Sequence, residues 1–494
     1  MNAGDYLTSE GIDDDIAVID GQNRYTYAEL RSAAAIVAGA LAGYRLPAGS
    51  RVAILGPNSF FWVVAYLAVT KLGLVAVPLS DKAGAEDIRR CIDAVDCSVA
   101  LVDRRYLQRH SAAVGSAIVI TDGILDSGQE PLWPESRTDP DSDAVLMFTS
   151  GTTGTPKAVR VTHRNIEANT DSIVSYLGLR RTDRVLVILP FFYCYGASLL
   201  HTHLRMGARV VLCGSFAFPE TAAKMLEEQE CTVFAGVPSS FQLLLRATSF
   251  ARRPLPSLRK IQQAGGKLPP VMIGELVAAK PDAELYVMYG QTEATARLSY
   301  LPPAMLGSKL GSIGKGIPGV QLQVLGPDFE PVPVGTKGEI YARGASISPG
   351  YFQDPEGTSA KFTPHGLRTG DVAVVDEEGY IFIVDRLDDF IKSWGYRVSS
   401  QEVEAAALQS TELVSAAAIG VPDDEAGEAI VLFVTVAPGS DITTEAVAAA
   451  CRSRLPKHMV PQSVLVIDSM PLNASGKISK AALRVLAAAQ SVSG

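Results

Sequence analysis

The chain has 494 residues, of which 47% are hydrophobic and 20% charged, and its formal net charge is −9. That length predicts several domain-sized units, and that composition is typical of a folded globular protein. The negative charge argues against broad electrostatic binding to nucleic acid or anionic lipid, and the six scattered cysteines argue against a zinc knot or a disulfide framework.

The first residues are acidic and lack the basic and apolar regions of a secretory signal. The most apolar stretch is Phe60–Leu79, but a lysine, a glycine and a proline interrupt it. We interpret it as a helix over Phe60–Lys71 and a buried strand over Leu74–Pro78, which belong to a soluble α/β unit. We therefore expect a cytoplasmic protein without a membrane span.

Short β-branched runs alternate with amphipathic helical stretches over most of the first 380 residues, which predicts parallel sheets covered by helices. The runs are Arg51–Leu55, Ser98–Val102, Ala117–Ile120, Arg184–Leu189, Ala208–Leu212 and Cys231–Phe234, and helical patterns cover Tyr27–Leu41 and Pro219–Glu230. After about Gly319, short strands joined by Gly, Pro and Asp turns predict a small β-rich module. Its strands are Val320–Leu325, Gly338–Ala342, Val372–Val375 and Tyr380–Val384.

A charged connection at Arg386–Asp389 separates this module from a last unit of roughly 100 residues, a usual domain size. The last unit mixes predicted helices and strands. They are the helices Gln401–Gln409 and Thr444–Arg454 and the strands Val414–Gly420, Ala429–Ala437 and Ser463–Ile467. We therefore expect an N-terminal domain over 1–385, a joint at 386–389 and an α+β C-terminal domain over 390–494.

The richest local signal is the segment Leu146–Lys157, an apolar strand followed by glycines and small hydroxylated residues and ended by Pro156 and Lys157. Glycines let backbone N–H groups turn toward a ligand, and Ser and Thr add neutral donors. Such a loop can wrap a polyphosphate while the lysine supplies a point charge. The segment does not match the Walker A pattern, so it predicts a different phosphate loop.

This segment resembles the phosphate loop of the adenylate-forming superfamily, which includes acyl-CoA synthetases, peptide-synthetase adenylation domains and luciferases. Further segments are similar to the family's motifs and occur in the family's order. They are Tyr289–Glu293 (Y-G-Q-T-E), Thr369–Asp371 (T-G-D), Arg386–Lys392, Gly395–Arg397 and Pro471–Lys477. The resemblance implies a large N-terminal domain of two α/β sheet subdomains plus the β-rich module, and a small mobile α+β C-terminal domain that acts as a catalytic lid.

The resemblance also implies roles for single residues. Thr292 is expected to donate to the α-phosphate, Glu293 to hold Mg²⁺, Asp371 to accept both ribose hydroxyls, and Lys477 to bridge the carboxylate and the α-phosphate. These roles suit the chemistry, because two anions must approach and cations and donors offset their charge. The expected ATP/AMP-binding residues are Thr149, Ser150, Gly151, Thr152, Thr153, Gly154, Lys157, Gly266, Lys267, Tyr289, Gly290, Gln291, Asp371, Arg386 and Arg397.

The hinge prediction rests on the resemblance alone. Asp388 is expected to be the pivot about which the C-terminal domain rotates between two half-reactions, with Arg397 moving alongside. A few residues that absorb a large backbone change are a normal means of domain closure.

The sequence says less about the identity of the acid substrate. Pro190–Gly196 resembles the family's P-L-F-H-x-x-G segment, with Tyr193 where many acyl-CoA synthetases have histidine. No acidic residue occurs from Leu189 to Met206, so a simple α-amino acid is disfavoured, because its ammonium group would lack a partner. Arg297 is a candidate for binding a second polar or anionic group of the acid, although a structural salt bridge is favoured. The expected acid-pocket residues are Phe192, Tyr193, Phe234, Gly236, Gly265, Ala294 and Arg297.

The sequence therefore predicts an acid–thiol ligase that uses ATP and Mg²⁺ to activate a small carboxylic acid as its acyl-adenylate. Only seventeen residues follow Lys477, so we expect a freestanding enzyme. The expected acceptor is coenzyme A, and the alternative is the phosphopantetheine of a separate carrier protein. A luciferase-like oxidase has no specific support, and a non-catalytic nucleotide-binding regulator is disfavoured by the intact Lys477, Glu293 and Asp371.

Overall fold

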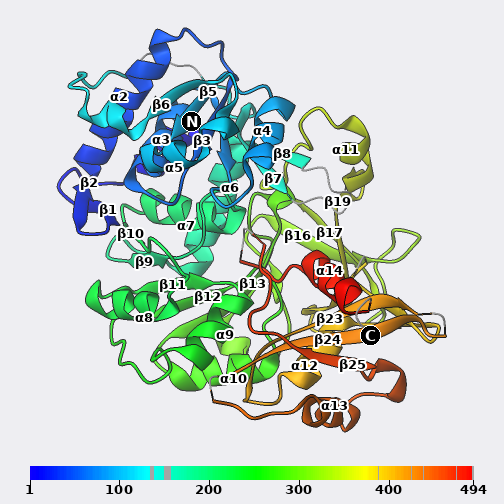
Figure 1. Cartoon of the computed structure of the whole chain (residues 1–494). Coiled ribbons are helices and arrows are strands. Elements are labelled where there is room, and N and C mark those ends of the chain that lie inside the picture. Colours follow the sequence, from blue (N-terminus) through cyan, green and yellow to red (C-terminus); the bar gives the residue numbers. More distant parts are fainter. Residues whose placement is uncertain are drawn as a thin grey trace.

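Four sheets organise the computed structural model of the chain, which describes residues 1–133, 138–149, 157–387, 389–423, 425–437, 439–473 and 476–491. Two large sheets are built from strands between residues 16 and 316, and a smaller sheet and the C-terminal sheet lie beside them (Figure 1). This arrangement confirms the predicted fold class. Within the described residues, no helix has both the length and the apolar composition that a membrane span requires.

The first large sheet has six strands, all parallel except for the last one in its order. Its central strands are buried on both faces, which explains their continuous apolar runs. Helices α2 and α3 contribute to the apolar cluster on one face, and α4 and α5 to the cluster on the other. In sheet order the strands are β6 (Ile118–Thr121), β5 (Val99–Val102), β3 (Arg51–Leu55), β4 (Val75–Leu79), β7 (Asp143–Thr149) and β8 (Lys157–Thr162). The helices are α2 (Tyr27–Gly43), α3 (Phe60–Lys71), α4 (Ala85–Ala94) and α5 (Arg104–His110).

The second large sheet has nine strands, and its edge hairpin comes from the start of the chain. Strand β1 pairs in parallel with β10 and antiparallel with β2, so residues 16–26 extend a sheet built mainly after residue 183. Helices α8, α9 and α10 pack with one face of this sheet. In sheet order the strands are β15 (Lys315–Gly316), β14 (Ser299–Leu301), β13 (Glu284–Tyr289), β12 (Lys260–Gln263), β11 (Val233–Gly236), β9 (Arg184–Val187), β10 (Arg209–Leu212), β1 (Ile16–Asp20) and β2 (Asn23–Thr26). The helices are α8 (Pro219–Glu228), α9 (Pro238–Ala247) and α10 (Pro270–Ala279).

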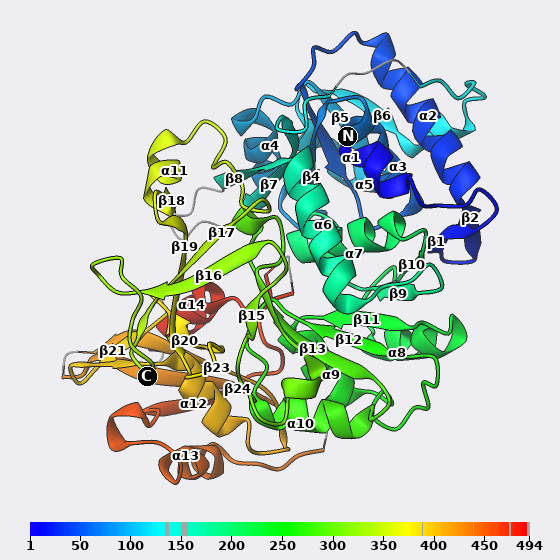
Figure 2. The same ribbon diagram turned by 180° about the vertical axis from the view of Figure 1, so that it is seen from behind.

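A helical layer joins the two large sheets. Helices α1 (Ala3–Thr8), α6 (His163–Leu177) and α7 (Cys194–Arg205) share one apolar cluster with α3 and with strands of both sheets (Figure 2). The predicted soluble helix Phe60–Lys71 is part of this layer, and its N-cap Ser59 accepts a hydrogen bond from the backbone N–H of Trp62. His201 and His203 are both buried here, and Tyr66 forms a 2.8 Å hydrogen bond with His201.

The β-rich module is a five-stranded antiparallel sheet, as the turn-rich sequence predicts. Its central strand places Asp371 directly opposite Arg386 on the neighbouring strand. The strands are β16 (Val320–Leu325), β17 (Gly338–Gly344), β18 (Phe362–Thr363), β19 (Gly366–Val375) and β20 (Ile381–Arg386), and helix α11 (Pro355–Lys361) precedes β18.

The C-terminal sheet is separate from the module that precedes it. It adds two elements to the prediction, the hairpin of β21 and β22 and the final helix α14. Asp388 lies outside the described residues, so the joint at 386–389 stays a prediction, as do the bounds 1–385 and 390–494. The strands are β21 (Ile391–Ser393), β22 (Tyr396–Val398), β23 (Leu413–Asp423), β24 (Gly427–Val436) and β25 (Ser463–Val466). The helices are α12 (Ser400–Ala407), α13 (Thr444–Arg452) and α14 (Lys480–Ser491).

Candidate active site

The Y-G-Q-T-E segment forms a tight turn after β13. A Cβ atom on Gly290 would lie 1.9 Å from the carbonyl oxygen of Ala296, so only glycine fits there. Thr292 then begins a short 3₁₀ helix, and Thr295 adopts a positive φ of 64° after it. The Thr295 hydroxyl donates to the Ser346 carbonyl at 2.7 Å. The turn therefore fixes the two residues predicted to serve the phosphate and the metal.

The carboxylate of Asp371 is buried between two partners that the sequence also predicted. Its Oδ2 accepts a hydrogen bond from the Tyr289 hydroxyl, and its Oδ1 accepts one from the Arg386 Nε at 3.1 Å. The same carboxylate raises the pKa of the Arg386 guanidinium. Strand pairing brings these groups together, because Asp371 and Arg386 face each other across β19 and β20.

Glu293 is held by a residue that the sequence analysis missed. Its side chain is buried, and its Oε1 accepts a 2.8 Å hydrogen bond from the Tyr351 hydroxyl. The Tyr351 ring also lies 4.9 Å from the Lys157 Nζ, which forms a 3.0 Å ion pair with Asp354. The only sequence signal near Tyr351 is the turn-and-helix pattern from Gly350 to Pro355. That pattern does not indicate that Tyr351 contacts Glu293.

Lys477 of the C-terminal domain reaches the N-terminal site. Its Nζ lies 5.3 Å from the centre of the Tyr193 ring, and a Cβ on Gly265 would approach both the Tyr193 hydroxyl and the Lys477 Cε. The Ser239 hydroxyl donates to the Gly476 carbonyl at 2.5 Å and so attaches this loop to α9. Burial lowers the pKa of Lys477, whereas the carboxylates of the site oppose that change.

Polar contacts also hold the C-terminal domain against the end of β20. Asp385 accepts hydrogen bonds from the backbone N–H of Ser400 at 2.9 Å and from its hydroxyl at 3.3 Å. The Lys480 Nζ donates to the same hydroxyl at 2.6 Å and lies 3.7 Å from Asp389 and 3.6 Å from Glu404. This cluster could not be predicted from the sequence, because a lysine on a helix usually faces solvent.

Two of the predicted acid-pocket residues lie away from Tyr193. Phe234 is fully buried and packs edge-to-face against Phe241 at 5.8 Å, in the cluster that α8, α9 and α10 share with the sheet. Neighbouring residues of a strand point to opposite faces, so Ala235, the next residue of β11, belongs to the apolar cluster on the α7 side of the sheet. The side chain of Ala294 is buried in the β-rich module's cluster with Ala342 and Leu367.

The remaining predicted pocket residues are near the C-terminal ends of their strands. Gly236 ends β11, and Gly265 follows β12 with a φ of 87°. Phe192 and Tyr193 immediately precede α7 and are half-buried. This edge is where open α/β sheets usually place their ligands.

The remaining predicted nucleotide-site residues lie on several different elements. Arg397 is exposed on the β21–β22 hairpin opposite Lys392, and the Lys267 Nζ donates to the Ile383 carbonyl at 3.3 Å. Thr149 ends β7, and its hydroxyl donates to the Lys157 carbonyl at 3.4 Å. Gln291 is half-buried in the turn after β13, and Gly266 lies against Pro238. The predicted residues Ser150, Gly151, Thr152, Thr153, Gly154 and Asp388 lie outside the described part of the chain.

The favoured salt-bridge role for Arg297 is contradicted. Its side chain is 2% exposed, and it forms no ion pair with any carboxylate among the described residues. Its guanidinium instead lies 4.3 Å from the centre of the Tyr195 ring. The sequence spacing could not show this, because the neighbours of Arg297 come from α6 and α7.

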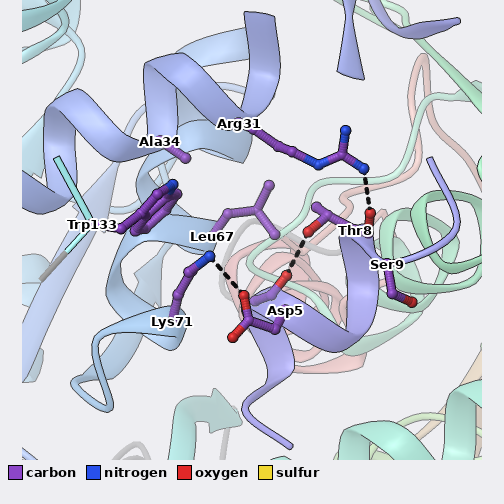
Figure 3. Close-up of a pocket in the computed structure, with 9 residues that line it drawn as sticks. Asp5, Thr8, Ser9, Arg31, Ala34, Leu67, Lys71 and Trp133 are labelled. Carbon is purple, nitrogen blue, oxygen red and sulfur yellow. Dashed lines mark hydrogen bonds and ion pairs between the residues drawn. The ribbon is translucent and has the colours of Figure 1, made fainter. Parts of the chain in front are cut away.

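A surface pocket of about 250 Å³ lies elsewhere, among α1, α2 and α3 (Figure 3). The Lys71 Nζ in this pocket lies 2.7 Å from Asp5 and 4.0 Å from the centre of the Trp133 ring. Arg31 donates to the Thr8 carbonyl at 2.7 Å. The cations of this pocket therefore already have partners, and none of the predicted site residues lines it.

The two-domain fold, with a lysine of the second domain inside the first, is that of an adenylate-forming enzyme. A model of AMP-binding enzymes matches residues 9–352, and one of the AMP-binding enzyme C-terminal domain matches residues 402–477. The chain therefore belongs to the AMP-binding enzyme family, as its motifs indicated.

Relatives and solved structures agree over nearly the whole chain. The chain is 33% identical to a feruloyl-CoA synthase of Amycolatopsis sp over 474 residues, covering 95% of each chain. It is 30% identical to a 2-succinylbenzoate–CoA ligase of Bacillus pumilus, covering 97% of this chain and 96% of the relative. The anthranilate CoA ligase AuaEII, solved with anthranoyl-AMP, has the same fold, with a TM-score of 0.92 at 23% identity and coverage of 99% and 98%. The protein is thus an ATP-dependent, AMP-forming acid–CoA ligase.

Proposed function

We propose that the residues around Tyr193 and Glu293 carry out both half-reactions of this ligase on a small acid without an α-ammonium group. In the first, a carboxylate oxygen attacks the α-phosphorus of ATP, and the bond to the bridging oxygen breaks to release pyrophosphate. In the second, the thiol sulfur attacks the acyl carbonyl, AMP leaves, and the thiol proton passes to solvent. The position of Lys477 in the N-terminal site is the single observation that most supports this assignment.

Lys477 acts in the first half-reaction. The attacking carboxylate and the α-phosphate are both anionic, so their approach is unfavourable unless a cation lies between them. A compact ammonium group suits that position. Its burial beside Tyr193 strengthens its electrostatic effect, because little water screens it there.

Asp371 and Arg386 bind the nucleotide's ribose end. The Asp371 carboxylate accepts hydrogen bonds from both ribose hydroxyls after it exchanges its present partners, and Arg386 adds a cation near the ribose and the phosphate. Thr292 donates to the α-phosphate, and Lys157 serves the outer phosphates after it leaves Asp354.

Glu293 fits the role of a Mg²⁺ ligand. Mg²⁺ prefers oxygen donors, and the buried Glu293 carboxylate is fixed by only one described side chain, Tyr351. When bound, Mg²⁺ offsets phosphate charge and orients the triphosphate. The chain's own part is to hold this carboxylate next to Thr292.

A rotation of the C-terminal domain at residues 386–389 then converts the arrangement for the first half-reaction into the arrangement for the second. The contact of Asp385 with Ser400, whose hydroxyl also accepts a hydrogen bond from Lys480, supports the adenylation arrangement, because it holds the C-terminal domain in the position that places Lys477 in the site. In the second arrangement Lys477 leaves and the thiol enters. Hinge closures of this kind need only a few residues that change backbone conformation.

The acceptor is tested by supplying two thiols to the same adenylating enzyme. A panel of alkyl and aryl acids is first screened for acid-dependent exchange of labelled pyrophosphate into ATP. With an acid that supports exchange, we expect coenzyme A to yield acyl-CoA and AMP in equal amounts. Mass spectrometry of the thioester and of a phosphopantetheine-bearing carrier protein measures both. Acylation of the carrier without formation of acyl-CoA would overturn the coenzyme A assignment.

A further inference from the structure

Arg297 occupies an unusual environment for an arginine. It is almost fully buried between the sheet and the helices α6 and α7, and no described Asp or Glu forms an ion pair with it. Its guanidinium lies over the Tyr195 ring, and one of its nitrogens approaches the Ser198 hydroxyl at 3.5 Å. Buried arginines are normally paired with an anion, because an isolated buried charge is costly. The site therefore lacks an anionic partner.

Buried polar atoms of Arg297 and of Gln262 have no hydrogen-bond partner among the described residues. The Arg297 Nε is buried and makes no hydrogen bond within the described structure, and the same holds for both amide atoms of the Gln262 side chain. Tyr195 connects the two residues, because its ring lies under the guanidinium and its hydroxyl donates to the Gln262 carbonyl at 2.8 Å. Buried polar groups in native proteins are nearly always satisfied, so this cluster indicates a polar ligand.

The cluster lies behind the position where the acid reacts. The Lys477 Nζ lies 5.3 Å from the centre of the Tyr193 ring, and the centres of the Tyr193 and Tyr195 rings are 6.5 Å apart. The Arg297 guanidinium lies 4.3 Å from the centre of the Tyr195 ring, so two neighbouring tyrosine rings connect the two cations. An acid with its reacting carboxylate at Lys477 therefore points its far end past Tyr193 toward Arg297.

We propose that Arg297, Gln262 and Tyr195 form a subsite for an anionic group at the far end of the substrate, which is therefore a dicarboxylic acid. A second carboxylate neutralises the buried guanidinium and accepts hydrogen bonds from its unpartnered Nε and from the Gln262 amide. The subsite rests on the proposed function, because it assumes that Lys477 marks the reacting end. Arg297 in this account sets specificity and takes no part in the chemical step.

A purely structural arginine makes a different prediction. If Arg297 only packs on Tyr195, its charge is irrelevant to the choice of acid, and removing it disturbs all acids alike. If it binds a carboxylate, removing it affects only acids that carry that group. Substrate pairs that differ only at the far end separate the two roles.

The experiment measures acid-dependent acyl-AMP formation, trapped with hydroxylamine, for matched acids. The pairs are the straight-chain dicarboxylic acids of four to nine carbons against the monocarboxylic acids of equal length, and terephthalate against 4-methylbenzoate. The monomethyl ester of each diacid provides a neutral oxygen at the same place. We expect one diacid to exceed its apolar and neutral partners by about 100-fold in kcat/KM, because a site built for a polar group strongly rejects analogues that lack it.

Three variants test the residues. Arg297→Met should lower kcat/KM for the preferred diacid by about 100-fold, mainly through KM, and leave the KM for ATP and the rate with the monoacid unchanged. Gln262→Leu should also lower kcat/KM for the preferred diacid, but by less. Arg297→Lys should retain part of the kcat/KM that Arg297→Met loses. The exposed Arg252→Met is the matched control and should change nothing.

Three results have separate meanings. An active enzyme that prefers monocarboxylic acids or neutral esters contradicts the subsite but leaves the ligase intact, and this outcome requires no variant to fold. An equal loss for diacid and monoacid in a folded Arg297→Met protein also contradicts it. Absence of pyrophosphate exchange with every acid contradicts the proposed function and the subsite together.

Discussion

Replacing Lys477 with alanine is expected to lower acyl-AMP formation by about 10²–10³-fold, the usual effect of removing one group that stabilises transition-state charge. The Lys477 ammonium lies inside the site beside Tyr193, so its loss leaves two anions to approach without a cation between them. Acid-dependent pyrophosphate exchange measures this step. Thioester formation from supplied acyl-AMP and coenzyme A should persist within a few fold, because Lys477 leaves the site in that half-reaction.

The matched control is Lys457→Ala, an exposed lysine of the same domain. It should leave both half-reactions unchanged. Equal losses in adenylation and in thioester formation would show that Lys477 supports the fold rather than the first step. Unchanged adenylation in Lys477→Ala would remove the residue from the mechanism.

Glu293→Gln is expected to have the second large effect. Glutamine keeps the shape and the hydrogen bond from Tyr351 but removes the negative charge that a divalent cation requires. We expect adenylation to fall by about 100-fold and the Mg²⁺ concentration for half-maximal rate to rise, since such losses are typical of groups that hold transition-state charge. Titrating Mg²⁺ at fixed, saturating ATP measures both quantities.

Tyr351→Phe is the companion variant, because it removes only the hydroxyl that positions the carboxylate. It should raise the Mg²⁺ concentration for half-maximal rate by only a few fold. Tyr351 does not bind the metal itself and only positions the Glu293 carboxylate that does. A wild-type Mg²⁺ titration for Glu293→Gln would show that the metal is bound elsewhere.

The sequence was sufficient for local elements, because their causes are local. Arg51–Leu55 is a strand and Phe60–Lys71 is a helix, both with the predicted bounds. Both predictions succeed because the periodicity of apolar residues and the capping of helix ends depend on residues only a few positions apart. The motif order along the chain was enough to identify the family. Asp371, Tyr289 and Arg386 come together as the motifs implied.

Contacts between distant segments were not predictable in this way. Residues 16–26 join a sheet whose other strands begin after residue 183, and no local pattern encodes that pairing. Phe234 faces the wrong side for the acid because a strand buried on both faces carries no alternation to show its orientation. Tyr351 reaches Glu293 across 58 residues, and its own neighbours in sequence do not indicate it.

Arg297 shows the same limit at the level of function. The sequence suggested either an ion pair or a contact with the acid, and only the three-dimensional neighbours distinguish them. Those neighbours are tyrosines, a serine and a cysteine rather than a carboxylate. The spacing of residues in the sequence therefore could not predict that Arg297 has no carboxylate partner among the described residues.

The chemistry of activation is tested most directly by following the oxygen of the acid. An acid that supports exchange is prepared with ¹⁸O in both carboxyl oxygens and incubated with the enzyme, ATP, Mg²⁺ and coenzyme A. We expect mass spectrometry to find one ¹⁸O atom in each AMP and none in pyrophosphate, because the carboxylate oxygen bonds to the α-phosphorus. Unlabelled AMP together with ¹⁸O in inorganic phosphate or pyrophosphate would contradict it.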